Sequence, residues 1–135
     1  MAWPYATYVN NLSGMSVTGV TRKYTEPPRS LNTADLPAMW PQLPTAENSS
    51  VTLTHISGLR QASVDLIIAV EPYQQSTNNA NFAATIALID NVETALVTNA
   101  ASFDIDRWTI RQGILEITEG SAFWILIVTV EGSGT

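Results

Sequence analysis

The chain has 135 residues, of which 45% are hydrophobic and only 13% charged, enough for the core of one domain but not for a highly charged surface. Soluble domains usually carry about 25% charged residues, so the composition favours extensive contact between subunits; a monomer rich in Ser, Thr and Asn is the alternative. The whole net charge of −6 arises in residues 60–135, where nine acidic residues accompany three arginines. Because nucleic-acid binding requires clustered Lys and Arg, this distribution argues against a conventional nucleic-acid binder.

The chain contains no cysteine, which excludes disulfides, thiol nucleophiles and cysteine-ligated metals. Its start lacks both a basic region and an apolar run, so we expect no secretory signal. The longest apolar run, Ala122 to Val128, is far shorter than the roughly 20 residues of a membrane helix. We therefore expect no membrane partner.

The first expected element is a short helix over residues 4–12. Pro4 suits a first helical turn, and apolar residues then recur at helical spacing, namely Tyr5, Tyr8, Val9 and Leu12. Asn10, Asn11, Ser13 and Gly14 favour its end. Val17 to Tyr24 alternates in the manner of a strand.

A proline-rich segment follows, and we expect it to form an extended arm over about residues 25–50. Five of the seven prolines lie between Thr25 and Pro44. Each lacks an N–H group and restricts its predecessor, so the pattern predicts neither a helix nor a central strand there. The segment is also too apolar for a free linker, since it contains Leu31, Leu36, Met39, Trp40 and Leu43. We expect it to be held by its own domain or by a neighbouring subunit.

A hairpin is predicted next, with strands over 49–56 and 59–71 around the Ser57-Gly58 turn. In the second strand one face is entirely apolar and should face the core, comprising Ala62, Val64, Leu66, Ile68 and Val70. Pro72 ends the strand.

The clearest helix is predicted over about residues 78–97. Its apolar residues recur at steps of three and four, namely Phe82, Ile86, Ile89, Val92 and Leu96. Ser76 to Asn79 offer N-cap residues.

Two strands complete the chain, over 103–118 and 122–130. The apolar phase of the first changes after Gly113, which predicts a bulge or a bend. The second is apolar on both faces and should be central, or covered by another subunit. Residues 132–135 are expected to be a flexible tail. This order predicts a single α+β domain over 1–135, with a mostly antiparallel sheet and both helices on one face.

Few residues suggest chemistry. His55 is the only histidine, and on a strand it is more typical of a structural residue than of a catalytic one. Asp104 and Asp106 could share a strand face and bind a cation or act as an acid–base pair, but solvated charges or partners for Arg107 and Arg111 are the preferred interpretation. We expect no enzyme, no cofactor and no catalytic, cofactor-binding or metal-binding residue.

The N-terminal helix and the proline-rich segment together resemble tail-terminator and tail-completion proteins of tailed bacteriophages, which act at the head–tail junction. The resemblance rests on Gly19-Val20, on Pro27-Pro28, and on Asp35-Leu36-Pro37-Ala38 followed by the aromatic Trp40, and it covers about a third of the chain. It implies a structural virion protein, assembled in the host cytoplasm, whose copies form a hexameric ring that ends the tail tube. The implied partners are further copies of the chain, the tail-tube protein and the head–tail connector protein, with DNA only as passing cargo.

The expected subunit interface lies in the arm, with Trp40 as the best candidate for an anchor in another subunit's pocket. Its full set is Arg22, Tyr24, Pro27, Pro28, Leu31, Asp35, Leu36, Pro37, Met39 and Trp40. A neck or tail-tube subunit is an alternative within the same class. A small ligand-binding domain or enzyme that uses His55, Asp104 and Asp106 is the alternative outside it.

Overall fold

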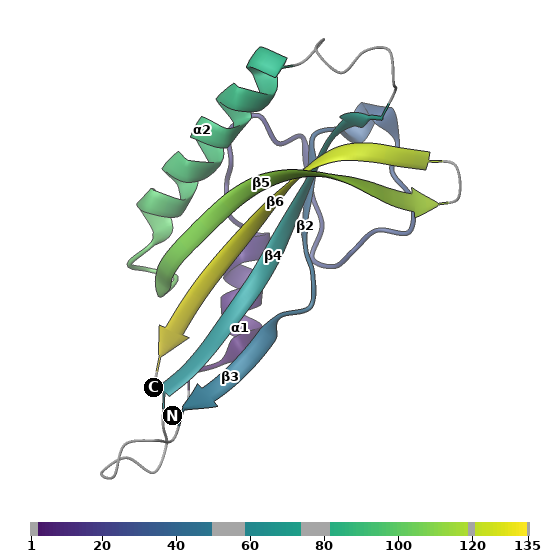
Figure 1. Ribbon diagram of the computed structural model, residues 1–135. Coiled ribbons are helices and arrows are strands. Elements are labelled where there is room, and N and C mark those ends of the chain that lie inside the picture. Colours follow the sequence, from purple (N-terminus) through teal and green to yellow (C-terminus); the bar gives the residue numbers. More distant parts are fainter. Residues whose placement is uncertain (1–2, 50–58, 74–81, 119–120, 135) are drawn as a thin grey trace.

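The computed structural model describes residues 3–49, 59–73, 82–118 and 121–134 and has an α+β fold (Figure 1). A six-stranded, mostly antiparallel sheet carries a main helix and a short N-terminal helix, as predicted. The elements are α1 (Tyr5–Ser13), β1 (Arg22–Lys23), a 3₁₀ helix (Thr33–Asp35), β2 (Ala38–Pro41), β3 (Thr45–Ser49), β4 (Leu59–Pro72), α2 (Phe82–Asn99), β5 (Ile105–Thr118) and β6 (Ser121–Gly134).

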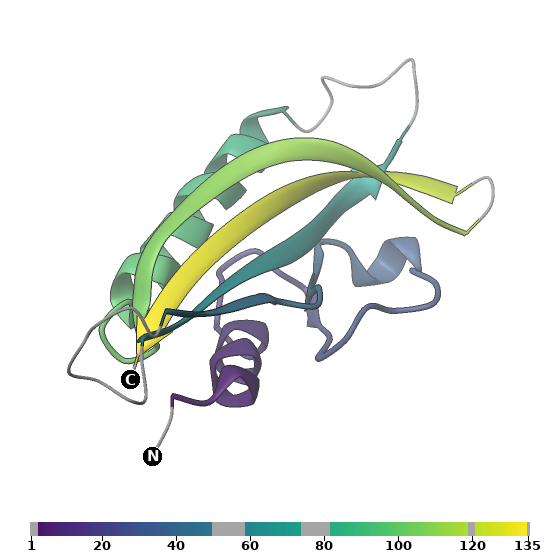
Figure 2. The ribbon, with the colours of Figure 1, turned by 60° about the horizontal axis from the view of Figure 1, so that its bottom comes forward.

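The sheet is built around two long central strands, β4 and β6. Its order is β1-β2-β4-β6-β5, and only the β1–β2 pair is parallel. β2 and β3 both pair with β4 on the side away from β6, β2 opposite residues 66–69 and β3 opposite residues 59–63. β5 forms the other edge and pairs with β6 along its length. The sheet is strongly twisted and curved (Figure 2).

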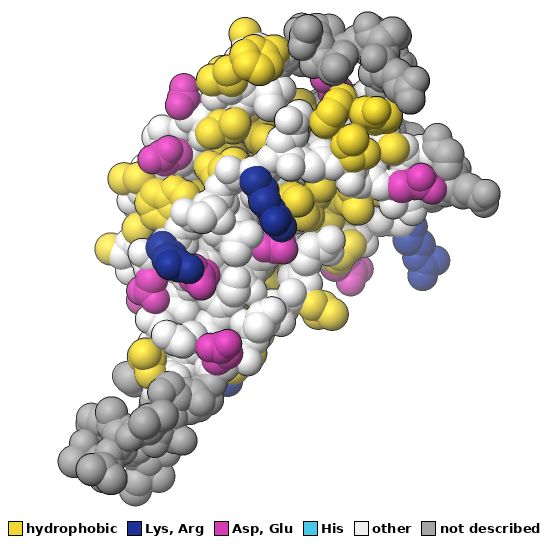
Figure 3. Space-filling view, in the orientation of Figure 1, with side chains coloured by type: hydrophobic (Ala, Val, Ile, Leu, Met, Phe, Trp, Pro, Cys, Tyr) yellow, Lys and Arg dark blue, Asp and Glu magenta, His cyan; other side chains and the backbone are white. Residues whose placement is uncertain are grey.

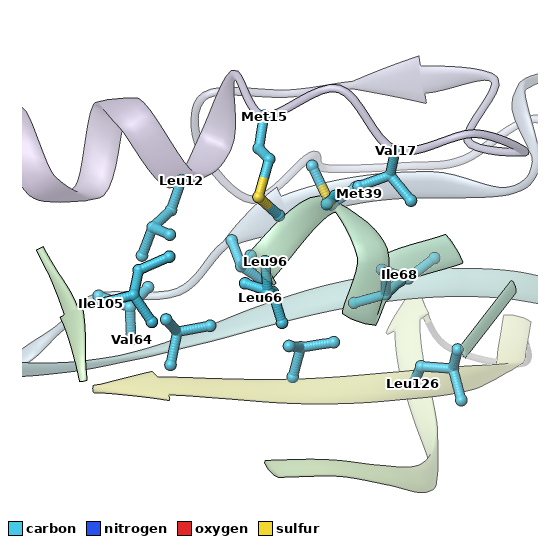
Figure 4. Packing of buried hydrophobic residues seen from close by; sticks show 14 of the residues in the cluster. Leu12, Met15, Val17, Met39, Val64, Leu66, Ile68, Leu96, Ile105 and Leu126 are labelled. Carbon is cyan, nitrogen blue, oxygen red and sulfur yellow. The ribbon is translucent and has the colours of Figure 1, made fainter. Parts of the chain in front are cut away.

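Both helices contribute to the main core on one face of the sheet. Leu12 and Met15 from the N-terminal region and Leu96 from α2 lie over Val64, Leu66 and Ile68 of β4 (Figure 4). The predicted core face of β4 is therefore confirmed, and burial of its alternate residues fixes the register of the strand. β6 is central, as its two apolar faces predicted, and Leu126, Val128 and Val130 face the same core.

A second, smaller core lies on the opposite face. It contains Ala38, Trp40, Ile67, Ala69, Phe123 and Ile125, and its margin includes Tyr24, Leu31 and Leu36. The proline segment, defined here as residues 24–37, thus helps to cover the second face of its own sheet. No other subunit is needed to bury these apolar residues.

The two cores explain the change of phase in β5 without a bulge at Gly113. Trp108 and Ile110 pack against the main core, whereas Leu115 and Ile117 pack against the second. The pairing with β6 is continuous from Arg107 to Glu116, and the register shifts occur only near the two ends of the strand. Of the two predicted alternatives at Gly113, a bulge or a bend, the bulge is wrong. The apolar phase changes because the covered face changes.

The extended arm expected over about 25–50 is also wrong as a single element. Residues 38–41 and 45–49 are strands of the sheet. β2 tolerates Pro41 because β1 pairs with β2 only at Ala38 and Met39. At Pro41 the strand has only β4 as a neighbour, so the missing N–H removes no hydrogen bond to β1. The expected strand over 49–56 and its turn lie almost wholly outside the described residues.

Both ends of the described chain are held at one end of the sheet (Figure 1). The Trp3 indole Nε1 donates a hydrogen bond to Asp104 Oδ2 at 3.0 Å, and a Cβ at Gly134 would lie 2.3 Å from the Trp3 ring. Residues 132–134 therefore belong to β6, and the expected flexible tail is wrong for them. Packing against aromatic rings, and not flexibility, is the reason for glycine at 132 and 134.

Candidate interface surfaces

The most apolar residues of the predicted interface belong to the subunit's own core. Met39 and Trp40 are 0% and 1% exposed, so their side chains cannot enter a pocket of another folded subunit. β2 directs Met39 to the main core and Trp40 to the second core because successive side chains of a strand alternate. The prediction that Trp40 is an intersubunit anchor is therefore wrong, because its side chain fills the second core.

The remaining predicted interface residues lie around a loop that is closed at its base. Tyr24 N donates to Met39 O at 2.8 Å, and Thr21 N donates to Pro37 O at the same distance. Arg22 lies 3.9 Å from Asp35 and over the Tyr24 ring, 5.2 Å from its centroid. These contacts fix the loop to the sheet.

Exposure varies along that loop. Arg22 and Pro27 are exposed, whereas the other six are only partly buried, namely Tyr24, Pro28, Leu31, Asp35, Leu36 and Pro37. Residues 24–30 line a shallow concavity. The parts of the predicted interface that remain most accessible are therefore Arg22 at the base of the loop and Pro27 at its tip.

A more apolar surface lies between α2 and the sheet. We call it the α2 groove; its volume is about 170 Å³. Its lining residues are Val70, Glu71, Phe82, Thr85, Ile86, Ile89, Ile110, Arg111, Gln112, Trp124, Ile125 and Leu126. Hydrophobic side chains line α2 and the neighbouring sheet on this face (Figure 3).

The exposed part of the groove belongs to the apolar stripe from which the helix was predicted. Phe82 and Ile86 share the helical stripe of Val92 and Leu96, but they are 63% and 46% exposed. The helix buries Leu88, Val92, Ala95 and Leu96 toward its C-terminal half, and its first two turns are covered less. Periodicity identifies the apolar face of a helix but not how much of its length a sheet covers.

Among the large hydrophobic residues that the structure describes, Leu43 is the most exposed, with 94% of its surface accessible. It lies in the short connection between β2 and β3, next to Gln42, whose N–H donates to Asp65 O at 2.8 Å. Pro41 and Pro44 flank this connection and restrict its backbone. Leu43 was noted in the sequence as part of the arm, but the interface prediction did not include it.

The acidic residues singled out in the sequence do not form a pair. Asp104 precedes β5 with φ of 60°, and Asp106 lies on the strand, so the two do not share a strand face. Asp104 accepts the hydrogen bond of Trp3, while Asp106 Oδ2 accepts one from Ser133 Oγ at 2.6 Å. Both carboxylates therefore have structural partners. His55 lies outside the described residues.

Asp106 also lines a polar hollow of about 340 Å³ at the end of the sheet where β3, β4, β5 and β6 meet. In this hollow Arg107 is bonded to Glu131, and the carboxylate raises the pKa of the arginine. Among the described residues, no group of three or more His, Cys, Asp or Glu side chains is arranged to hold a metal ion. No described helix is long and apolar enough to span a membrane.

Comparison with protein-family models and with curated proteins gave no match.

Proposed function

We propose that this chain is a structural subunit of a tailed-phage virion, and that its copies form a ring that terminates the tail tube and joins it to the head-side connector. The proposal combines the resemblance of the N-terminal third with the surface of the folded subunit. The tail-tube and connector proteins are its proposed partners, and the virion is its proposed location. DNA passes through the ring without specific binding.

The observation that carries the proposal is that the described part of the subunit leaves apolar side chains accessible in different places, among them Leu43 and the α2 groove. A contiguous apolar groove on a surface poor in charge is typical of a protein-binding site. Two distinct patches on one subunit favour a head-to-tail contact, which generates a ring when the rotation closes.

The charge is compatible with passing DNA. Residues 60–135 carry the whole net charge of −6. An acidic ring repels phosphate groups and so limits adhesion to the duplex, whereas a basic one would retain it. This is support for the proposal and not an independent argument for it.

Mass photometry of the purified protein tests the proposal. We expect one dominant species at a fixed multiple of the 14.6 kDa subunit. Long polymers of variable mass would favour the alternative of a tail-tube subunit. A monomer at every concentration that can be measured would contradict self-assembly into a ring.

A further inference from the structure

We infer that Leu43 of one subunit inserts into the α2 groove of the next copy, which makes this pair the repeated contact of the assembly. The inference rests on the proposed self-assembly and names the residues that carry it. Neither feature belongs to the interface that the proline-rich segment suggested.

Leu43, in the connection between β2 and β3, is the inserting residue. A leucine that is 94% exposed has no role in its own core. The prolines on both sides of its connection and the Gln42 N–Asp65 O bond of 2.8 Å restrain the backbone that presents it. A restrained segment loses little conformational freedom on binding, which favours its use as an anchor.

The α2 groove is the receiving site. The α2 groove has aliphatic and aromatic walls from α2, β5 and β6, with Phe82, Ile86 and Trp124 among them. Its volume is about 170 Å³, and an apolar cavity of about 150 Å³ can hold benzene. A leucine side chain has fewer carbon atoms than benzene, so the groove can accommodate it.

Leu43 and the α2 groove lie at different positions on the subunit. Leu43 follows β2, which flanks β4 on the side away from β6. The groove lies over β5, β6 and the end of β4, beside α2. The ribbon shows the β2–β3 connection and α2 on different sides of the sheet in both orientations (Figures 1 and 2).

Leu43 therefore does not fill the groove of its own subunit, and its side chain remains exposed. Each copy added by this contact leaves one free leucine and one free groove at the ends of the assembly. Such a heterologous contact continues until rotation closes a ring. A second copy of the chain is thus the occupant that the exposed leucine favours.

The contact is tested with two single variants and a matched control. Leu43→Asp removes the inserting residue, and Ile86→Asp places a charge in the groove. Val97→Asp is the control: Val97 is 59% exposed on α2, lies outside the groove, and undergoes the same change in charge. Circular dichroism melting identifies the variants that are folded. Phe82→Asp replaces Ile86→Asp if the latter unfolds, since an acidic residue is favourable at a helix start.

We expect the control to assemble as the wild type does. Leu43→Asp and Ile86→Asp should each weaken association by about tenfold or more and remain monomeric under the same conditions. A 1:1 mixture of the two variants should form heterodimers, because one intact leucine can enter one intact groove. Mass photometry and size-exclusion chromatography with light scattering measure each species.

Normal assembly of folded Leu43→Asp would overturn the inference and leave the ring proposal standing. The same holds if the mixed variants fail to associate. A monomeric wild type would contradict the proposed function itself. A wild-type assembly of only two subunits would contradict the ring, while heterodimers in the mixture would still support the leucine contact.

Discussion

Tyr8 is a buried aromatic residue whose hydroxyl group has no hydrogen-bond partner among the described residues. The side chain is 2% exposed and packs from α1 into the main core. A buried polar group without a partner costs about 1–3 kcal/mol. We expect Tyr8→Phe to leave the free energy of unfolding unchanged or to raise it by roughly 1 kcal/mol, as measured by urea denaturation. A clear loss of stability would mean that the hydroxyl group has a partner, for example a water molecule.

The same residue should make stability depend on alkaline pH. Burial raises the pKa of Tyr8, and the carboxylates of Asp106, Glu131 and Asp104 raise it further. Above about pH 10 the unfolded chain loses this proton while the folded chain keeps it, so unfolding becomes more favourable as pH rises. Denaturation curves between about pH 8 and pH 11 should show a smaller loss of stability for Tyr8→Phe than for the wild type.

A substitution at Trp40 distinguishes most clearly between a role in the core and a role in the subunit interface. Its ring is 1% exposed and lies in the second core beside Ile67 and Phe123. We expect Trp40→Ala to lower the free energy of unfolding by about 3–5 kcal/mol, because it leaves a cavity. Leu36→Ala is the comparison, since Leu36 is only partly buried at the margin of the same core and should cost less. A stable Trp40→Ala protein that fails only in assembly would restore the interface interpretation.

At the scale of the element, the C-terminal end of β6 requires glycine, because neighbouring atoms leave no room for a side chain. A Cβ at Gly132 would lie 2.6 Å from both Asp104 O and the Tyr8 ring, and the backbone oxygen cannot move cheaply. We expect Gly132→Ala to destabilise the fold by about 1–3 kcal/mol through overpacking. Thermal melting of Gly14→Ala is the control, because its Cβ would meet Asn10 O at an ordinary 3.5 Å. Equal melting temperatures for the two variants would contradict this account.

Periodic elements could be predicted from the sequence, and elements defined by long-range pairing could not. Helices α1 and α2 and strands β4, β5 and β6 follow from spacing that one covered face imposes. β2 was missed because Pro41 argues against a strand, and β3 was assigned to the proline-rich arm that ends beside it; only pairing with β4 makes both segments strands. The phase change in β5 was seen, but its cause, a second core built partly by the proline segment, depends on tertiary structure.

The candidate surfaces were harder to predict for the same reason. Leu43 and Trp40 are both apolar residues of one proline-rich stretch, yet one is 94% exposed and the other 1%. Only the pairing of β2 with β4 separates them. Similarly, Phe82 and Val92 belong to one helical stripe, and only the extent of the sheet beneath α2 decides which is covered.

For the whole molecule, the α+β body combines a well-packed internal core with apolar side chains that stay exposed in the described part of the chain, Leu43 and the α2 groove among them. Stable interfaces bury roughly 1,200–2,000 Å² in total, so Leu43 can only be the anchor of a larger contact. Phe82 and Ile86, which line the groove, and Ile114 on the edge strand are exposed and can add apolar surface to such a contact. A subunit with two such unlike sides is suited to a closed ring.

Electron microscopy of the purified wild-type protein tests this central claim most directly. We expect closed rings of one size, in which every subunit presents its α2 side to the β2–β3 side of its neighbour. Isolated subunits in every image would contradict it.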